Sequence, residues 1–400
     1  MSPLRSAACG LASLLALPGV ARAAPPDPPN ALLVTYSPAE FAIVTQRRGV
    51  WTALRIEDPG SLVLHDARPF TPTGGRPGIL TLGGSAASVK LWRREPAGFV
   101  AETLWTASFG GKISRMREVE AADLDRDGRL DLAVATHDQG VVAVVEPNGE
   151  GWRARELLRR PGRWVHEIEV GDLDGDGVPE VYASLTTPNG TDAMPLAGEV
   201  LRLVPARPER PPAVAAERAG QLAKELLVSD LDGDGRDELY VAFEGEVEGT
   251  RAVVPVEIRR YDAGSDPHAG ALVASIPDKG CRTLVPGDLD GDGRRELVAA
   301  CVGSGLWWLR PGSDARAPWR TTSIERRSAG YNHPAAIGDL DADGESELYV
   351  ANDLQGRIDR YTWREGRLAQ EVILPRAKKK RDGISWSLAV VPAALAEPAR

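Results

Sequence analysis

The 400-residue sequence lacks the features that mark several common functions. It has no basic excess, because its formal net charge is −9 at pH 7, and this argues against a nucleic-acid partner. It contains no Gly-x-Ser-x-Gly, no phosphate-binding loop and no dinucleotide fingerprint, so no local motif identifies an enzyme. A catalytic site assembled from distant segments would leave no such motif, so an enzymatic function stays open.

Long apolar runs are also scarce. The apolar stretch at residues 7–17 is well short of the roughly 20 residues that span a bilayer. It follows Arg5 and precedes Ala21-Arg22-Ala23, a pattern typical of a secretory signal peptide. We therefore predict a signal peptide at 1–23, a proline-rich leader at 24–30 and one domain at 31–400. We expect no transmembrane anchor and a secreted, periplasmic or cell-surface location.

Cysteine is rare, with three residues, and Cys9 falls in the predicted signal peptide. Cys281 and Cys301 lie on either side of a predicted hairpin loop, at nearly equal distances from it. They should therefore face each other on its two strands, and in an oxidising compartment we predict a disulfide between them. Two buried free thiols are the alternative.

The sequence does contain one acidic motif five times. Each copy has the form Asp-x-Asp-x-Asp-Gly-x-x-Asp/Glu and leads into an apolar segment. The acids are Asp123, Asp125, Asp127 and Asp131; Asp172, Asp174, Asp176 and Glu180; Asp230, Asp232, Asp234 and Glu238; Asp288, Asp290, Asp292 and Glu296; and Asp339, Asp341, Asp343 and Glu347. Two carboxylates about 4 Å apart repel by roughly 4 kcal/mol at an effective dielectric constant near 20. The motif therefore predicts a cation site.

The ligand chemistry points to calcium. Oxygen ligands select Ca²⁺ or Mg²⁺, and a flexible loop with several carboxylates favours the larger Ca²⁺ ion. An EF-hand is excluded, because its twelfth position is here a strand core residue such as Val241 rather than a glutamate. The glycine at position 6 should have a positive φ. We predict about five structural Ca²⁺ sites; the alternative is five Asp-Gly hairpins without metal.

The spacing of the copies predicts an all-β architecture. The first aspartates are 49, 58, 58 and 51 residues apart, and such periods with several short strands each indicate a β-propeller. Residues 31–112 lack the motif but keep strand signals at 31–36, 41–45, 50–56, 61–65, 78–82, 88–92 and 99–105. Two further blades fit there, which gives seven four-stranded blades, five of them with a metal loop. A strand at about 384–391 should close the ring by pairing with the N-terminal blade.

The repeated Gly-Asp-Leu-Asp-Gly-Asp-Gly-x-x-Glu-Leu resembles the FG-GAP/VCBS repeat of integrin-α-like β-propellers. The resemblance covers about residues 113–376 and implies the propeller fold and calcium binding. Proteins of this kind include adhesion receptors, lectin-like modules and a few polysaccharide lyases and dehydratases, so the resemblance does not specify a ligand.

A basic residue stands six positions before each first aspartate: Arg117, His166, Lys224, Arg282 and His333. In a propeller this position opens the innermost strand, so the side chains should ring one mouth of the central channel. Such a ring suits an anionic ligand such as a uronic acid or phosphate. Alternatively, each pairs with a neighbouring acid and closes the channel. Most of the ten tryptophans should pack between blades.

We therefore expect a secreted, calcium-binding propeller that acts as a non-catalytic binding or adhesion module. Its partner would be a glycan, an anionic ligand or a protein. The alternative is a carbohydrate-active enzyme, such as a polysaccharide lyase, that uses the channel mouth with His166 and His333 as candidate bases.

Overall fold

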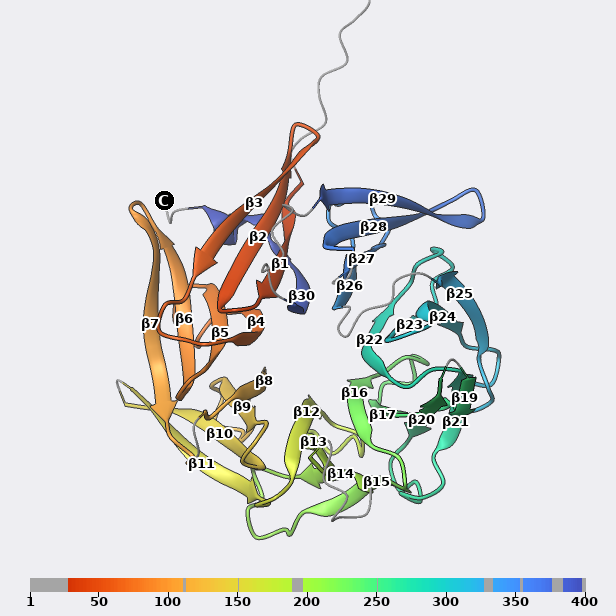
Figure 1. The fold of residues 1–400 in the computed structure, drawn as a ribbon. Coiled ribbons are helices and arrows are strands. Elements are labelled where there is room, and N and C mark those ends of the chain that lie inside the picture. The colour runs from red at the N-terminus through yellow and green to blue at the C-terminus, as the bar shows by residue number, and fades with distance from the viewer. Residues whose placement is uncertain are drawn as a thin grey trace, which may run out of the picture.

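The computed structural model describes residues 28–110, 113–149, 151–188, 197–249, 251–326, 334–352, 355–375 and 384–397. Among these residues, seven four-stranded antiparallel sheets stand around a central axis as the blades of a propeller (Figure 1). The sequence-based prediction of a seven-bladed, all-β propeller is confirmed. None of the helices in the described part of the chain has the length and apolar character of a membrane span.

The first three blades include the N-terminal strands and the first acidic loop. From the rim to the centre, the first blade contains β3 (Val50–Glu57), β2 (Glu40–Arg47), β1 (Asn30–Tyr36) and β30 (Ser385–Pro392). From the centre to the rim, the second contains β4 (Leu64–Phe70), β5 (Gly78–Gly84), β6 (Ala87–Glu95) and β7 (Gly98–Ala107). The third contains β8 (Met116–Ala122), β9 (Asp131–Thr136), β10 (Val141–Asn148) and β11 (Gly151–Arg159).

The other four blades repeat the same order from centre to rim. The fourth contains β12 (Trp164–Gly171), β13 (Glu180–Thr186), β14 (Ala197–Leu203) and β15 (Ala213–Ala219). The fifth contains β16 (Ala223–Ser229), β17 (Glu238–Phe243), β20 (Val256–Tyr261) and β21 (Ala271–Ile276). The sixth contains β22 (Cys281–Gly287), β23 (Glu296–Cys301), β24 (Gly305–Arg310) and β25 (Arg320–Glu325). The seventh contains β26 (Ala335–Gly338), β27 (Glu347–Asn352), β28 (Arg357–Arg364) and β29 (Arg367–Pro375).

The ring is closed by the C-terminal strand. β30 pairs antiparallel with β1, with Leu388 facing Val34 and Val391 facing Ala31. The first sheet therefore contains strands from both ends of the chain, which leaves no open edge between the last and first blades. A short 3₁₀ helix, η1 (Ala393–Ala396), follows β30.

Packing between neighbouring sheets explains the apolar segments that follow the acidic motifs. Second strands such as β9, β17 and β23 are buried along their whole length, because a blade covers each of their two faces. Among the described residues, seven hydrophobic clusters each join two adjacent sheets, including the seventh with the first. Strands buried on both faces are continuous apolar runs rather than alternating ones.

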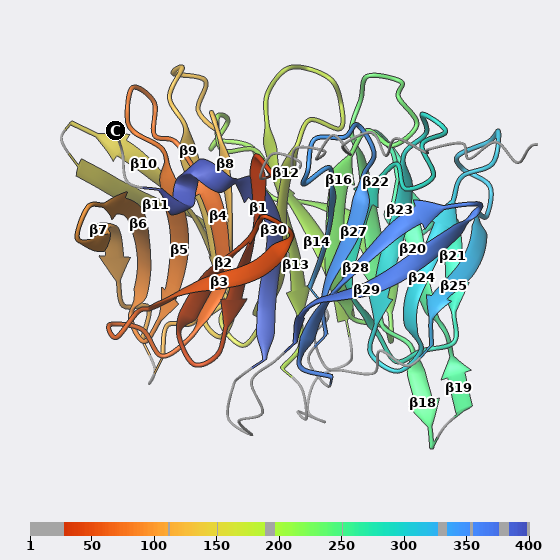
Figure 2. The same cartoon turned by 90° about the horizontal axis from the view of Figure 1, so that it is seen from above.

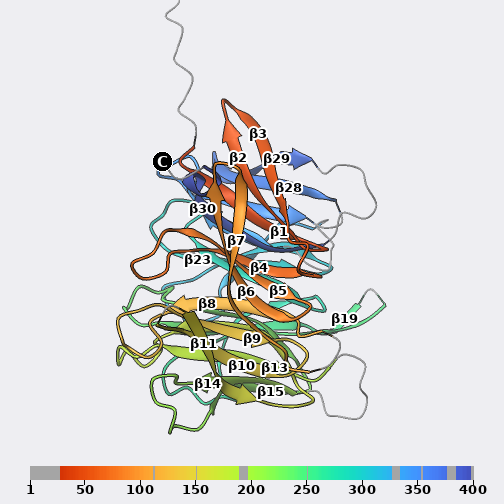
Figure 3. The same cartoon turned by 90° about the vertical axis from the view of Figure 1, so that its left-hand side faces the viewer.

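Three local features depart from or add to this regular pattern. The strand predicted at 61–65 is wrong in its bounds: β4 starts at Leu64, because the Ser61 hydroxyl bonds to Asp58 at 2.8 Å in a turn. A disulfide joins Cys281 to Cys301, which face each other on β22 and β23. The hairpin β18 (Glu246–Glu248) and β19 (Arg251–Val254) projects from the face opposite η1 (Figures 2 and 3).

Candidate metal loops and central channel

The five acidic motifs form the turns between the first and second strands of blades three to seven. All five position-6 glycines have the predicted positive φ, from 77° at Gly177 to 93° at Gly344. Position 4 is also left-handed, which sequence reasoning missed: Gly233 has φ 75° and Arg126, without a glycine's freedom, has φ 66°. The glycines at position 4 in three copies were the available signal.

Backbone hydrogen bonds hold each loop in one shape. The position-1 aspartate accepts bonds from the amides of positions 5 and 6; for Asp288 these come from Asp292 at 3.2 Å and Gly293 at 2.8 Å. The position-9 acid accepts a bond from the amide of position 2, as Glu296 does from Leu289 at 3.0 Å. The loop therefore orients its carboxylates without using all of their oxygen lone pairs.

The carboxylates converge as a divalent cation requires. One oxygen from each of Asp230, Asp232, Asp234 and Glu238 lies within 4.8 Å of the others, and the same holds for the four acids of the sixth blade. In the third and fourth blades the acids at positions 1, 3 and 5 form such groups. An all-oxygen donor set of this kind fits Ca²⁺.

The position-9 acids show the electrostatic cost that a cation would relieve. They are almost fully buried, with Glu238 1% and Glu296 2% exposed. Burial raises the pKa of both carboxyls to about 7, and that of Asp131 to about 6. A cation bound at the loop would favour the ionised form of these groups and lower their pKa.

On the inner strands, the predicted basic residues lie at irregular points of the sheet. Arg117, His166, Lys224 and Arg282 each fall where the pairing of the first and second strands shifts by a β-bulge. His333 lies outside the described residues. The structure thus brings four of the five predicted side chains to corresponding positions around the axis.

These basic side chains are largely compensated by neighbours. Arg282 binds Glu244 at 2.7 Å, and Lys224 lies 3.7 Å from the same carboxylate. Arg117 donates to the backbone carbonyl of His166 at 2.9 Å. Burial, together with these nearby cations, holds the pKa of His166 well below its usual value, so the imidazole is neutral at pH 7. The positive potential at the channel mouth is therefore smaller than the number of basic residues there suggests.

Blades one and two contribute two residues to the channel that could not be predicted from the spacing of the acidic motifs. His65 of β4 and Trp386 of β30 occupy the corresponding bulges. Their rings are 4.5 Å apart and edge-on, and the Arg117 guanidinium lies 5.9 Å from the Trp386 ring. No acidic motif follows these strands, so the six-residue spacing gave no signal for them.

In three of the inner strands, a side chain at the bulge links one blade to the next. Glu118 accepts a bond from the Ile168 amide of the following blade at 2.9 Å, and Glu225 accepts one from the Leu284 amide at 2.9 Å. Ser387 accepts the corresponding bond from Ala67 at 3.3 Å. These side chains therefore fasten neighbouring inner strands together around the axis.

The central channel contains a partly open cavity of about 500 Å³ with two unlike walls. One wall carries carboxyl groups of β4, β8, β12 and β16, and the other is formed by apolar residues of β22, β26 and β30 such as Val285, Ala336 and Val390. On the polar wall, Arg68 binds Asp66 at 2.8 Å, Glu118 at 2.9 Å and Glu120 at 2.6 Å. We call the first set the polar wall and the second the apolar wall.

Burial raises the pKa of several carboxyl groups of the polar wall. Burial, with the charge of Glu225 nearby, raises the pKa of Glu167 to about 8. Burial also raises the pKa of Glu118 well above its usual range, and Glu118 shares a hydrogen bond with Glu167. Glu118, Glu120 and Glu169 offer oxygens within 4.8 Å of one another, but Arg68 already supplies a positive charge there.

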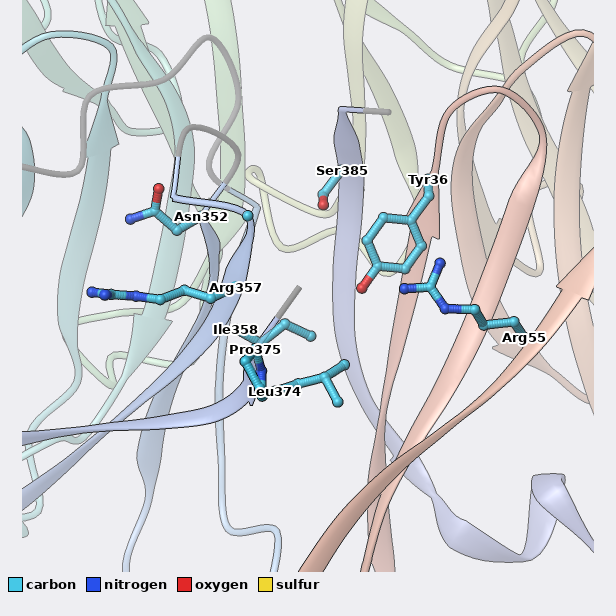
Figure 4. A pocket seen from close by; sticks show the side chains of 9 residues that line it. Tyr36, Arg55, Asn352, Arg357, Ile358, Leu374, Pro375 and Ser385 are labelled. Carbon is cyan, nitrogen blue, oxygen red and sulfur yellow. The ribbon is translucent and has the colours of Figure 1, made fainter. Parts of the chain in front are cut away.

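A second cavity marks the junction of the first and seventh blades. Tyr36 and Arg55 line it from one side, and Asn352 and Arg357 from the other (Figure 4). Its volume of about 30 Å³ suffices for a water molecule and is too small for an organic ligand.

Comparisons with known proteins agree with this architecture. The family described as "FG-GAP-like repeat" matches residues 123–183 and 288–350, which contain the whole acidic loops of the third, fourth, sixth and seventh blades. Comparison with curated proteins finds no significant match.

Solved structures share the fold at low identity. A lectin from Agrocybe aegerita, described as recognising non-reducing terminal N-acetylglucosamine, has a TM-score of 0.55 and 14% identity, covering 92% of this chain and 95% of the lectin. Proposed 6-phosphogluconolactonases are similar too. The protein from Bacteroides uniformis has a TM-score of 0.58 and 15% identity over 92% of this chain and 100% of its own. The protein from Bacteroides fragilis has a TM-score of 0.56 and 13% identity, covering 92% of this chain and 99% of its own. The chain is therefore a seven-bladed β-propeller that contains FG-GAP-like repeats.

Proposed function

We propose that this protein is an exported, calcium-stabilised propeller that binds a glycan in its central channel without transforming it. The observation that carries the proposal is the cavity of about 500 Å³ with a polar and an apolar wall. A sugar ring offers hydroxyl groups on its edges and C–H groups on its faces. The carboxyl and guanidinium groups would bind the former, and the aliphatic side chains would cover the latter.

The calcium part of the proposal is supported by the five loops. The acids at positions 1, 3, 5 and 9 would hold the ion, which would supply positive charge where the buried position-9 carboxyls now have a raised pKa. Because the loops join the first two strands of five blades, bound calcium would stabilise the native fold by mass action.

The non-catalytic part is supported by the hydrogen bonds of the polar wall. Glu118 and Glu225 are fixed to backbone amides of the next blade, and Arg68 is bound by three carboxyl groups. Groups that are engaged in this way can orient a ligand, whereas a general base needs a free lone pair near the reacting proton.

The ligand class is supported by the fold shared with the Agrocybe aegerita lectin, which is described as recognising a terminal sugar. An acidic sugar would extend the sequence-based prediction of an anionic ligand, because Arg117 and Arg282 line the cavity. Export is supported by the Cys281–Cys301 disulfide, since such bonds persist in oxidising compartments. The predicted signal peptide, 1–23, lies outside the described residues.

One observation favours the second candidate, a carbohydrate-active enzyme. Glu167, with a pKa of about 8, would carry a proton at neutral pH inside the cavity, as a general acid must. Incubation with acidic polysaccharides and detection of new reducing or unsaturated ends would distinguish this candidate. Turnover that Glu167→Gln abolishes would replace the binding proposal.

A glycan array probed in millimolar calcium tests the binding proposal. Thr283→Trp places a large ring in the cavity from β22 and should abolish binding of any glycan that the wild type retains. Thr52→Trp, at an exposed position on the outer strand β3, is the matched control and should bind normally. If Thr283→Trp binds as the wild type does, the ligand is not held in the channel.

A further inference from the structure

Two of the acidic loops are almost identical in sequence and differ in the side chains that the neighbouring third strand places next to them. Residues 230–238 and 288–296 differ only at position 8, Asp237 against Arg295. Both present four carboxylate oxygens within 4.8 Å of one another. Apart from the charge at position 8, a difference in metal binding between these loops would come from the surrounding strands.

In the fifth blade, an arginine of the third strand contacts the acidic loop. Arg260 of β20 faces Tyr240 in the sheet register and is only 1% exposed. Its guanidinium lies 2.7 Å from Asp232 and 3.2 Å from Glu238, which are the acids at positions 3 and 9. Asp262 holds the same guanidinium at 2.5 Å. A permanent positive charge thus contacts two of the four predicted ligands.

In the sixth blade, a tryptophan occupies the corresponding place. Trp308 faces Val298, which stands two residues after the position-9 acid, just as Tyr240 does in the fifth blade. Arg310 lies farther along the same strand, at 3.7 Å from Asp290, with its guanidinium 4.2 Å from the Trp308 ring. This loop opens into a hollow of about 480 Å³ that Asp290, Asp292 and Glu296 help to line.

The fourth blade repeats the arrangement of the fifth. Arg202 of β14 faces Tyr182 and contacts both Asp174 and Glu180, the acids at positions 3 and 9. The seventh blade has the same Tyr–Arg pair, but there Arg360 lies 3.7 Å from Glu347 and binds Glu371 at 2.6 Å. Direct contact with both ligands is therefore a property of the fourth and fifth blades among these four.

We propose that Arg260 and Arg202 are built-in counter-cations, so that the fourth and fifth loops bind calcium weakly while the sixth loop binds it tightly. The inference rests on the calcium binding proposed above. An arginine side chain does not lose its proton in proteins, so its charge competes with the ion at every pH. The chain then has two classes of calcium site, and the loops with a counter-cation keep their shape when calcium is scarce.

Calorimetric titration of the mature protein with Ca²⁺ tests this difference. Asp288→Asn should remove one site from the tight class, whereas Asp230→Asn should leave the tight class unchanged. Arg260→Met removes the counter-cation and should tighten the fifth-blade site by about tenfold or more, since the guanidinium charge lies beside two of the four predicted ligands and repels the ion. Arg316→Met removes an exposed arginine that also pairs with Asp262 and should change neither class.

A measurement on the wild type avoids any folding defect of the variants. Hydrogen exchange followed by mass spectrometry should show residues 288–296 gaining protection on addition of calcium. Residues 230–238 should already be protected in EDTA. Equal calcium responses of the two loops, or an unchanged site in Arg260→Met, would overturn the inference while leaving calcium binding intact. No calcium binding at all would instead overturn the proposed function.

Discussion

Arg68 is the positive charge on which the polar wall of the channel depends. Its guanidinium binds Asp66, Glu118 and Glu120 at 2.8, 2.9 and 2.6 Å, and the carboxyl of Glu118 also fastens the third blade to the fourth. Arg68→Met keeps much of the side-chain volume and removes the charge. The variant should therefore expose the cost of crowding carboxylates on one wall of the cavity.

The expected loss of stability depends on pH. Removing one partner of a buried ion pair costs about 3–5 kcal/mol, and the channel leaves the Arg68 side chain 36% exposed to solvent, so we expect about 2–3 kcal/mol at pH 8. Burial raises the pKa of Glu120 to about 6, and without Arg68 it should rise further. Protonation then removes the repulsion, so the loss at pH 5 should be less than half of that at pH 8.

Urea unfolding in excess calcium at pH 5 and pH 8 measures both values. Arg76→Met is the matched control, because Arg76 of the same blade pairs with Glu95 at 3.0 Å on the surface, with 59% of its side chain exposed. Such a pair contributes less than about 1 kcal/mol. A loss for Arg68→Met that equals the control's, or that is larger at pH 5 than at pH 8, would refute this account of the polar wall.

Three further predictions concern stability in excess calcium. The folded-state pKa of Glu167 is raised to about 8, so its contribution to the stability of the fold is present below about pH 4.5 and is lost as the pH rises toward 8. Glu167→Gln should therefore flatten the fall of the melting temperature between these pH values. An unchanged slope would contradict this prediction. Replacing Cys281 and Cys301 with serine should cost about 3 kcal/mol in urea for a bridge spanning 20 residues; equal midpoints would show that the bridge contributes nothing. Gly287→Ala should lower the free energy of unfolding by about 1–3 kcal/mol, because the added Cβ would lie 2.4 Å from a side chain of β26. Gly312→Ala is the control, because its Cβ would meet nothing within 4 Å. Equal effects of the two substitutions on urea unfolding would contradict the packing argument.

The architecture was predictable because a local sequence pattern, repeated five times, specifies it. Five copies of one loop at regular spacing fix the position of the first two strands in five blades. The apolar run after each copy shows a strand buried on both faces. Cys281 and Cys301 could be matched for the same reason, since a hairpin around a known loop places facing residues symmetrically.

The central channel was less predictable because its contacts join different blades. The bond from Ile168 to Glu118 spans 50 residues, and that from Leu284 to Glu225 spans 59. No local pattern indicates which amide a glutamate will meet. The sequence therefore predicts that basic side chains gather at the channel mouth, but not that Glu244 compensates two of them.

The same limit applies to the loops themselves. The acids at positions 1, 3, 5 and 9 are visible in the sequence, whereas the counter-cation Arg260 lies 22 residues beyond Glu238 and reaches it only through the pairing of β17 with β20. Its presence beside a loop depends on strand register. Sequence alone therefore treats five loops as equivalent, although their electrostatic surroundings differ.

Thermal unfolding of the mature protein in EDTA and across a calcium titration tests the central claim most directly. Each site that binds only the native state adds about 1.4 kcal/mol at tenfold saturation, so several sites should raise the midpoint by many degrees, with a smaller effect of magnesium. A midpoint that does not change between EDTA and millimolar calcium would contradict a calcium-stabilised propeller.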